Sequence, residues 1–202
     1  KEDNIHNVVT MDQFSLQDLD GTQGIGKTRY GLVIADVPPT GQEPYFQFIP
    51  LRTLASTPSQ KAFQRFLLAK GLQVAQVIVY CDAHRSLVKI CTGLNLHPKH
   101  PAPGQDGKGN PVIERIGGVC LNGIRAGLTP AGFPNCFWPT VGHAYAFNRC
   151  MNNGSYVRIT GDTTKFTLFV PGQLVFFIPA PTVEKRAKTD NRLKAGIFMD
   201  YY

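Results

Sequence analysis

The chain has 202 residues, of which 43% are hydrophobic and 17% are charged, and 21 Lys and Arg side chains against 14 Asp and Glu give a formal net charge of +7. This length is typical of one domain of medium size. The 20 Gly and 15 Pro indicate many turns and short elements, which excludes a coiled coil or a helical bundle. No apolar run approaches the ~20 residues that span a bilayer, so we expect no membrane insertion.

The first part of the chain predicts strands that follow an irregular start. Residues 1–26 are polar and rich in turn formers, and they predict an N-terminal arm. β-branched and aromatic runs then predict strands at Tyr30 to Val37, Tyr45 to Ile49, Val74 to Tyr80 and Leu87 to Ile90.

One segment carries the signals of a helix. Its capping signals are complete, with Thr57 at the N-cap, Pro58 at the first helical position and Gly71 after the last turn. The apolar residues between them recur at the spacing of one buried helical face. We therefore predict a single helix over Pro58 to Lys70 (58–70), outside a β-rich body.

The second half of the chain predicts a strand meander. Residues 123–142 contain three prolines and predict an irregular stretch. Turns at Asn153-Gly154, at Gly161-Asp162 to Thr164 and at Pro171-Gly172 divide Ala144 to Ile178 into four short strands, and Gly196 to Tyr202 predicts a last one. A basic segment at 184–194 lies between them. The fold class expected is mainly β, an antiparallel barrel or sandwich formed by one domain over 1–202.

The sharpest motif is Gly21 to Thr28, which satisfies the phosphate-binding pattern G-x-x-x-x-G-K-T. That chemistry needs a buried strand before the loop and a helix after it. Here a β-branched run follows, at Tyr30 to Ile34, so a glycine-rich turn is the favoured interpretation. A nucleotide-binding enzyme that uses Lys27 and Thr28 remains the alternative.

The potential metal and nucleophile residues form no recognisable pattern. Five cysteines are widely spaced, so we expect packed thiols rather than a disulfide framework. Zinc could use Cys81, His84, Cys91, His97 and His100, but the two later histidines lie in a proline-rich loop. Cys120 or Cys136 with His143 lacks the flanking pattern of a cysteine protease. We expect no catalytic residue, no metal and no cofactor.

Basic and aromatic residues alternate at Tyr156 to Arg158 and at Lys165-Phe166. This pattern leaves open an OB-like binder of single-stranded nucleic acid. A half-buried strand produces the same alternation, and a net charge of +7 is modest for that function. Nucleic acid is therefore not the partner we expect.

The predicted meander at Ala144 to Ile178, together with the basic tail at Glu184 to Lys188, resembles a protruding domain of a non-enveloped virus capsid, and most of all the astrovirus capsid spike. The resemblance implies a dimeric β-barrel on the virion surface, made in the host cytoplasm. It implies attachment to a host-cell receptor, a glycan or a protein, without enzymatic activity.

A long polar loop within 95–111 is the candidate contact surface for such a receptor, because long loops in compact domains are often functional. Its candidate contact residues are His97, Lys99, His100, Gln105, Asp106, Lys108 and Asn110. Consecutive apolar positions in Tyr45 to Ile49 and Gln173 to Ile178 predict strands that are apolar on both faces. A second copy would cover them, so we predict a homodimer.

Overall fold

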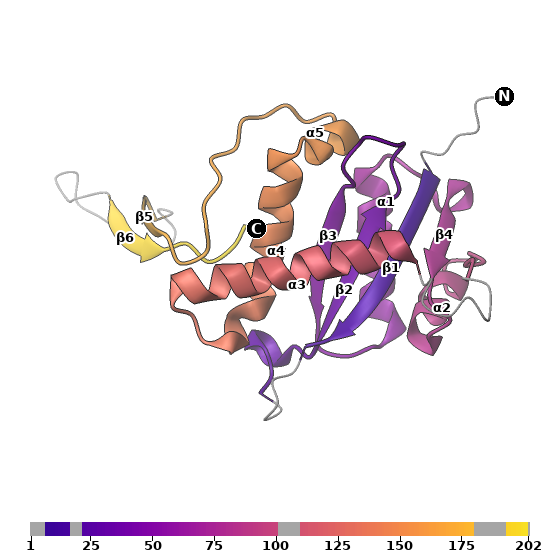
Figure 1. Ribbon diagram of the computed structural model, residues 1–202, viewed down its shortest axis with the longest axis horizontal. Coiled ribbons are helices and arrows are strands. Elements are labelled where there is room, and N and C mark those ends of the chain that lie inside the picture. Colours follow the sequence, from indigo (N-terminus) through magenta and orange to yellow (C-terminus); the bar gives the residue numbers. More distant parts are fainter. Residues whose placement is uncertain (1–6, 17–21, 101–109, 180–192, 202) are drawn as a thin grey trace.

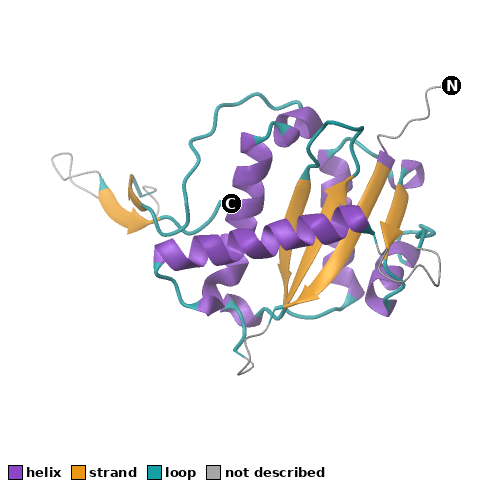
Figure 2. Cartoon of the chain, viewed as in Figure 1, coloured by secondary structure: helices purple, strands orange, loops and turns teal. Residues whose placement is uncertain are grey.

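A computed structural model describes residues 7–16, 22–100, 110–179 and 193–201. A four-stranded sheet lies at its centre, with helices on both faces (Figures 1 and 2). The strands β1 (Val8–Ser15), β2 (Tyr30–Asp36) and β3 (Phe46–Leu51) form an antiparallel meander. Strand β4 (Ile78–Cys81) pairs parallel with β1 on its other side, so the strand order is β3-β2-β1-β4.

Helices cover the sheet in two layers (Figure 1). Helices α3 (Pro111–Ala131) and α4 (Trp138–Asn152) lie on one face, and α1 (Ser56–Ala69) and α2 (Arg85–Thr92) lie on the other. The short helix α5 (Ser155–Thr160) follows α4. No helix among the described residues has the length and apolar character that a membrane span requires.

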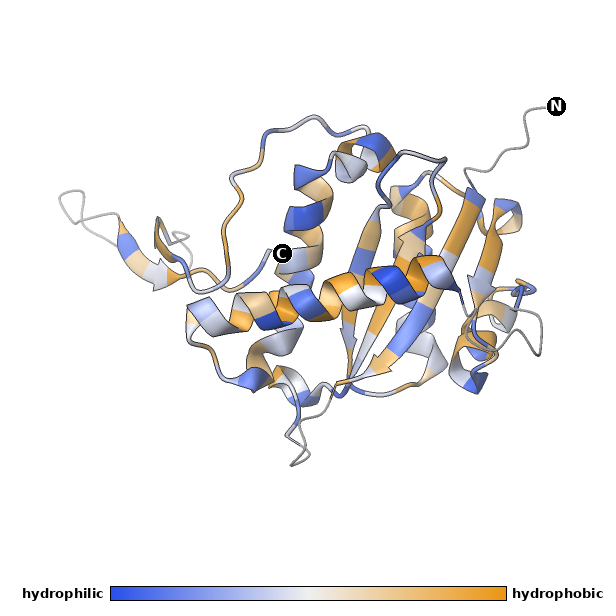
Figure 3. Ribbon diagram, viewed as in Figure 1, coloured by the Kyte–Doolittle hydropathy of each residue, from blue (hydrophilic) through white to orange (hydrophobic). Residues whose placement is uncertain are grey.

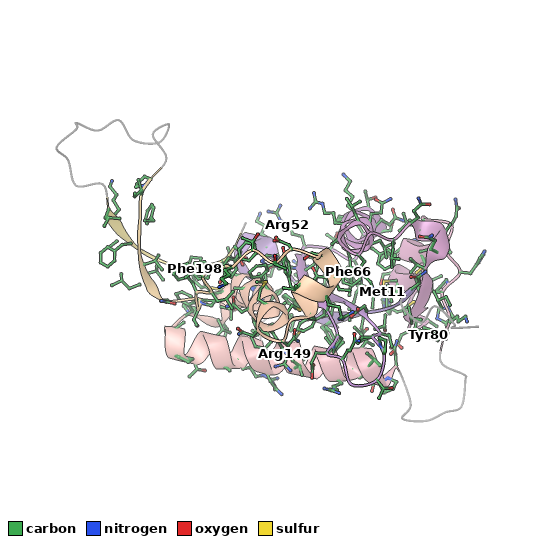
Figure 4. All side chains as sticks on the ribbon, turned by 90° about the horizontal axis from the view of Figure 1, so that it is seen from above. Met11, Arg52, Phe66, Tyr80, Arg149 and Phe198 are labelled. Atoms are coloured by element: carbon green, nitrogen blue, oxygen red, sulfur yellow. The ribbon has the colours of Figure 1, made fainter. Side chains whose placement is uncertain are left out.

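Short elements complete the chain. One-turn 3-10 helices occur at Ile25–Lys27, Val74–Gln76 and Asn135–Phe137. Strands β5 (Leu174–Phe177) and β6 (Lys194–Ile197) form a separate antiparallel ribbon that projects away from the body (Figure 4).

Successive side chains of a strand point to opposite faces of the sheet, so β1 contacts both helix layers. Thr10 and Phe14 point toward α3, where Thr10 meets Asn110 and Phe14 meets Gly117. Gln13 points the other way and bonds to Ser86 of α2. The strands are largely hydrophobic (Figure 3). The core consists of residues from both layers, including the fully buried Phe48, Phe63, Phe66, Met11 and Leu32.

Several predicted elements are confirmed. β2 and β3 are the strands predicted at 30–37 and 45–49, and α1 is the helix predicted at 58–70. β4 takes the end of the predicted strand at 74–80, and β6 overlaps the start of the one at 196–202. Most of the basic segment 184–194 lies outside the described residues.

The mainly β fold class is wrong, because the chain is a mixed α/β protein. Residues 8–15 of the predicted arm form β1 at the centre of the sheet. The stretch 123–142, expected to be irregular, belongs largely to α3 and α4. The predicted strand 87–90 is helix α2, in which Leu87, Ile90 and Cys91 share one buried face.

The predicted meander at 144–178 is also wrong. Its first part is α4 and α5, and only Leu174–Phe177 forms a strand. The Asn-Gly and Gly-Asp turns border helix α5 instead of joining strands, because Gly154 and Gly161 adopt φ of 75° and 69°, the left-handed region at which a helix starts or stops. No barrel or sandwich forms among the described residues.

Candidate active site

Four of the seven predicted receptor-contact residues belong to the described part of the chain. Lys99 and His100 lie along the outer edge of β4, where the Lys99 N–H donates to the Val79 carbonyl (2.8 Å) and His100 Nδ1 is 2.9 Å from the Cys81 carbonyl. His97 is exposed just before them. Asn110 starts α3 on the other side of β1. Gln105, Asp106 and Lys108 lie outside the described residues.

The glycine-rich motif lacks the structural context of a nucleotide site. A one-turn 3-10 helix, Ile25–Lys27, is followed directly by strand β2 rather than by an α-helix. The Thr28 hydroxyl donates to the Ile25 carbonyl (3.0 Å), so it already has a partner within the turn. The turn therefore does not present the helix N-terminus that a P-loop requires.

The cysteines are packed thiols, as predicted. All five are free, and all but Cys136 are buried. Burial raises the pKa of Cys120 to about 12, which makes it a poor nucleophile at neutral pH. His143 bonds to Asp200, with 2.7 Å between Nδ1 and Oδ1. Within the described part of the chain, no three His, Cys, Asp or Glu side chains form a closed metal cage.

Two carboxylates that the sequence analysis did not select lie opposite each other at the β1–β4 pair. The parallel register matches Thr10 with Tyr80 and Met11 with Cys81. One step further, it brings Asp82 opposite Asp12. Paired residues of neighbouring strands point to the same face, so both carboxylates lie on the α3 side, as Thr10 does.

A third carboxylate, Glu114, is brought to the same place by α3. The helix is fixed to β1 at two points, where the Asn110 amide donates to the Thr10 hydroxyl and where Gly117 packs on the Phe14 ring. Glu114 lies one turn after the first contact on α3, and Asp12 lies between the two contacts on β1. Residues four apart share a helix face, so Glu114 is positioned over Asp12.

The electrostatics of Asp12 are influenced by both other carboxylates. Burial raises the pKa of Asp12, and the negative charges of Asp82 and Glu114 raise it further. A hydrogen bond from the Gln13 N–H to Asp12 Oδ1 (2.7 Å) opposes the rise, and His84 opposes it more weakly. Asp12 is half-buried, whereas Asp82 and Glu114 are exposed.

A hydrogen-bonded chain holds the start of α2 against β1. The Ser86 hydroxyl donates to Gln13 Oε1, and His84 Nδ1 lies 2.7 Å from the same hydroxyl. Gln13 follows Asp12, and His84 comes two residues after Asp82. The chain of bonds therefore fixes the two strand segments that carry these carboxylates relative to each other.

This arrangement suits divalent cations. Carboxylate oxygens are hard ligands, which Mg²⁺ and Mn²⁺ prefer. A cation would also offset the mutual repulsion that raises the pKa of Asp12. The donor type fits such ions, whereas among the described residues no three His, Cys, Asp or Glu side chains are grouped closely enough to hold one.

No protein-family model and no curated protein matches the chain. Among solved structures, it is similar to the simian T-cell lymphotropic virus intasome in complex with the PP2A regulatory subunit B56 gamma, with a TM-score of 0.50, 8% identity, and coverage of 95% of this chain and 67% of that one. This likeness shows the fold.

The chain is also similar to the HTLV-2 integrase catalytic core domain in complex with magnesium (trimeric form), with a TM-score of 0.43, 12% identity, and coverage of 68% of this chain and 82% of that one. Both neighbours are viral proteins, and neither is a capsid spike.

Proposed function

We propose that this chain is a phosphoryl-transfer enzyme that cleaves or joins phosphodiester bonds of nucleic acid with divalent cations held by Asp12, Asp82 and Glu114. The observation that carries the proposal is the meeting of these carboxylates on the α3 face of β1, together with the raised pKa of Asp12. The intasome-like fold and the net charge of +7 support it.

Each carboxylate has a distinct role in this proposal. Asp12 lies between the other two and is the shared ligand, because both of their charges act on it. Asp82 and Glu114, which are exposed, face the substrate side. Cations held at such a site activate an attacking water or hydroxyl and stabilise the leaving oxygen of a phosphodiester. Asn110, Gly117 and the Ser86–Gln13 bond keep the three ligands in register.

This proposal differs from the receptor-attachment function that the sequence resemblance implied. Attachment, the virion-surface location and the homodimer stay predictions. Among the predicted contact residues that the structure describes, Asn110 contacts Thr10 beside the carboxylates, which gives it a structural role there.

A DNA-processing assay with matched variants tests the proposal. The full chain is incubated with end-labelled duplex DNA and Mg²⁺ or Mn²⁺. Cleavage or strand joining is expected, with a loss of at least about 100-fold in Asp12→Asn, Asp82→Asn and Glu114→Gln. Asp162→Asn is the matched control, because that carboxylate is far along the chain, just after α5.

Calorimetry with Mn²⁺ gives a second readout that needs no substrate. The wild-type chain and Asp162→Asn should bind the ion, and Asp12→Asn should bind it at least about 10-fold more weakly. Equal Mn²⁺ affinity of the wild type, Asp162→Asn and Asp12→Asn would overturn the proposal. Equal DNA-processing activity of the wild type and the three site variants would do the same.

A further inference from the structure

A second charged group lies on the same face of the sheet, just beyond the C-terminal end of β1. The Leu16 N–H donates to the Arg29 carbonyl (2.8 Å), and the Arg29 N–H donates to the Leu51 carbonyl (2.9 Å). The pairing of β1, β2 and β3 therefore continues one residue beyond the strands. It places Leu16, Arg29 and Arg52 in one row.

This row faces the same side as Asp12. Every second residue of a strand shares a face, so Asp12, Phe14 and Leu16 point the same way, and Arg29 follows its partner Leu16. Arg52 lies at the surface (Figure 4) and lines a cavity together with residues of α4, which covers this face.

The glycine-rich turn adds a third cation and a concave backbone. Lys27 is exposed, with φ of 63°, next to Gly26 with φ of 74°. The Arg52 guanidinium lies against this turn, 3.8 Å from the position that a Cβ on Gly26 would take. The adjoining cavity of about 640 Å³ is lined by Gly26, Thr28, Arg52 and His143, among others.

The three cations have no carboxylate partner among residues 7–16, 22–100, 110–179 and 193–201. Asp200 lines the same cavity, but its Oδ1 is bonded to His143. Gln23, with its amide oxygen turned to Arg29, accepts from Nε (3.0 Å) and Nη2 (2.6 Å) and so holds that guanidinium in place. Like charges on neighbouring strands repel, and an anion would relieve the repulsion.

We propose that Lys27, Arg29 and Arg52 form a phosphate-binding subsite for the backbone of the nucleic-acid substrate. Arginine forks match phosphate oxygens, and the unneutralised charges favour a polyanion. Leu16 is four residues from Asp12 along β1, about 13 Å at ~3.3 Å per residue. Arg29 and Arg52 lie one and two strands to the side of Leu16, and a DNA strand carries one phosphate per ~3.4 Å along the duplex axis, so the subsite holds the substrate at least about four nucleotides from the carboxylates.

This inference rests on the proposed function and names where its substrate is held. The test measures binding of a labelled duplex by fluorescence anisotropy, without divalent cations, over a range of salt concentrations. The double variant Arg29→Ala/Arg52→Ala should bind at least about 10-fold more weakly, and the slope of log K against log salt should fall by about 2. Arg52→Lys keeps the charge and should retain most of the salt dependence.

Lys61→Ala is the matched control, because Lys61 is an exposed base on α1, on the other face of the sheet. Its salt slope should stay that of the wild type. Thermal melting of each variant verifies that it is folded. Inorganic phosphate at the same total phosphate concentration should displace little DNA if the ligand is a polymer, and displacement at that concentration would contradict the polynucleotide assignment.

The outcomes separate this inference from the proposed function. If the double variant binds DNA with the wild-type affinity and slope, or loses no more than Lys61→Ala does, the subsite is wrong, whatever the activity. If Arg29→Ala/Arg52→Ala binds DNA more weakly but Asp82→Asn keeps full activity in the cleavage assay, the phosphate-binding subsite is supported and the proposed catalytic site is wrong.

Discussion

Asp36 and Asp12, on neighbouring strands, are two shielded carboxylates in opposite surroundings. Asp36 Oδ2 lies 2.9 Å from Arg158 Nη1 and 3.4 Å from Lys70 Nζ, and its Oδ1 accepts from the Tyr45 N–H at 2.6 Å. Asp12 receives one hydrogen bond, from the N–H of the next residue, and two other carboxylates face it.

The two sets of neighbours distinguish Asp36, which has a structural role, from Asp12, which we propose binds a cation. A buried charge that the chain itself neutralises holds elements together, as Asp36 joins β2 to α1 and α5. A half-buried charge whose nearest charged neighbours are mainly like charges, as at Asp12, raises the free energy of the folded state unless a ligand compensates it. Changing each residue in turn tests whether this contrast is real.

The largest expected effect is on stability at Asp36. Asp36→Asn removes the negative charge that pairs with the Lys70 ammonium and the Arg158 guanidinium, and breaking a buried ion pair costs about 3–5 kcal/mol. Denaturant unfolding should show this loss, whereas Asp162→Asn should change stability by less than about 0.5 kcal/mol. Similar unfolding curves for both variants would mean that the Asp36 cluster is not structural.

The close approach of α3 to β1 should have the next largest effect. A Cβ on Gly117 would lie 2.3 Å from the tip of the Phe14 ring, so Gly117→Ala forces the helix and strand apart. Overpacking of this kind costs about 1–3 kcal/mol, and Glu114, one turn away, should lose its place above Asp12. Unfolding and DNA cleavage are measured together.

Gly118→Ala is the control for that prediction. Nothing lies within 4 Å of its added Cβ, so the same substitution one position along should stabilise the helix by about 0.5–1 kcal/mol. If both alanines behave alike, the position of Glu114 does not depend on the Phe14 contact.

A smaller effect is expected where α3 begins. Asn110→Ala removes the donor to the buried Thr10 hydroxyl, at a cost of about 1 kcal/mol. Mn²⁺ affinity should also fall, because the helix end that carries Glu114 is less well fixed. Asn122→Ala, on the exposed side of the same helix, should leave both quantities unchanged. Unaltered Mn²⁺ binding in Asn110→Ala would show that this anchor does not position the site.

The smallest expected effect is on stability at Asp12. Asp12→Asn should stabilise the fold without metal, whereas Asp36→Asn should destabilise it. The raised pKa of Asp12 favours the folded state while the carboxyl is protonated, and this advantage is lost as pH rises through the folded-state pKa. Without metal, Asp12→Asn should therefore melt slightly higher than the wild type at neutral pH, by about 2–4 °C for each kcal/mol relieved.

That gap should close as the pH is lowered, because the wild-type carboxyl then becomes neutral too. Saturating Mn²⁺ should reverse the order, since a ligand bound only by the folded wild type stabilises it. A variant that melts below the wild type without metal would contradict the contrast with Asp36.

Local signals predicted part of this fold. Complete capping residues identified α1, an apolar, partly β-branched run identified β2, and an aromatic run identified β3. Strand β1 was missed because Asp12 and Gln13, which we place in the proposed site, interrupt its apolar pattern. Functional residues are where such patterns are expected to break.

The second half was mispredicted because tertiary contacts override weak helix propensity. Gly117 and Gly123 in α3 disfavour a helix, yet they allow contact with the Phe14 and Tyr145 rings. The site itself depends on topology, because Asp12, Asp82 and Glu114 are distant in sequence. The available signals were Asp82, which directly follows β4, and Glu114, which lies in the first turn of α3 after Pro111.

The pairing of β1 with both β2 and β4 has a consequence for the order of folding. Contacts between β1, β2 and β3 join neighbours in sequence, so this meander has short loops to close. The contact of β1 with β4 joins distant segments, and such contacts form late because chain entropy must be lost first. Asp12 and Asp82 therefore meet only near the end of folding, so the proposed cation site is complete only in the fully folded chain.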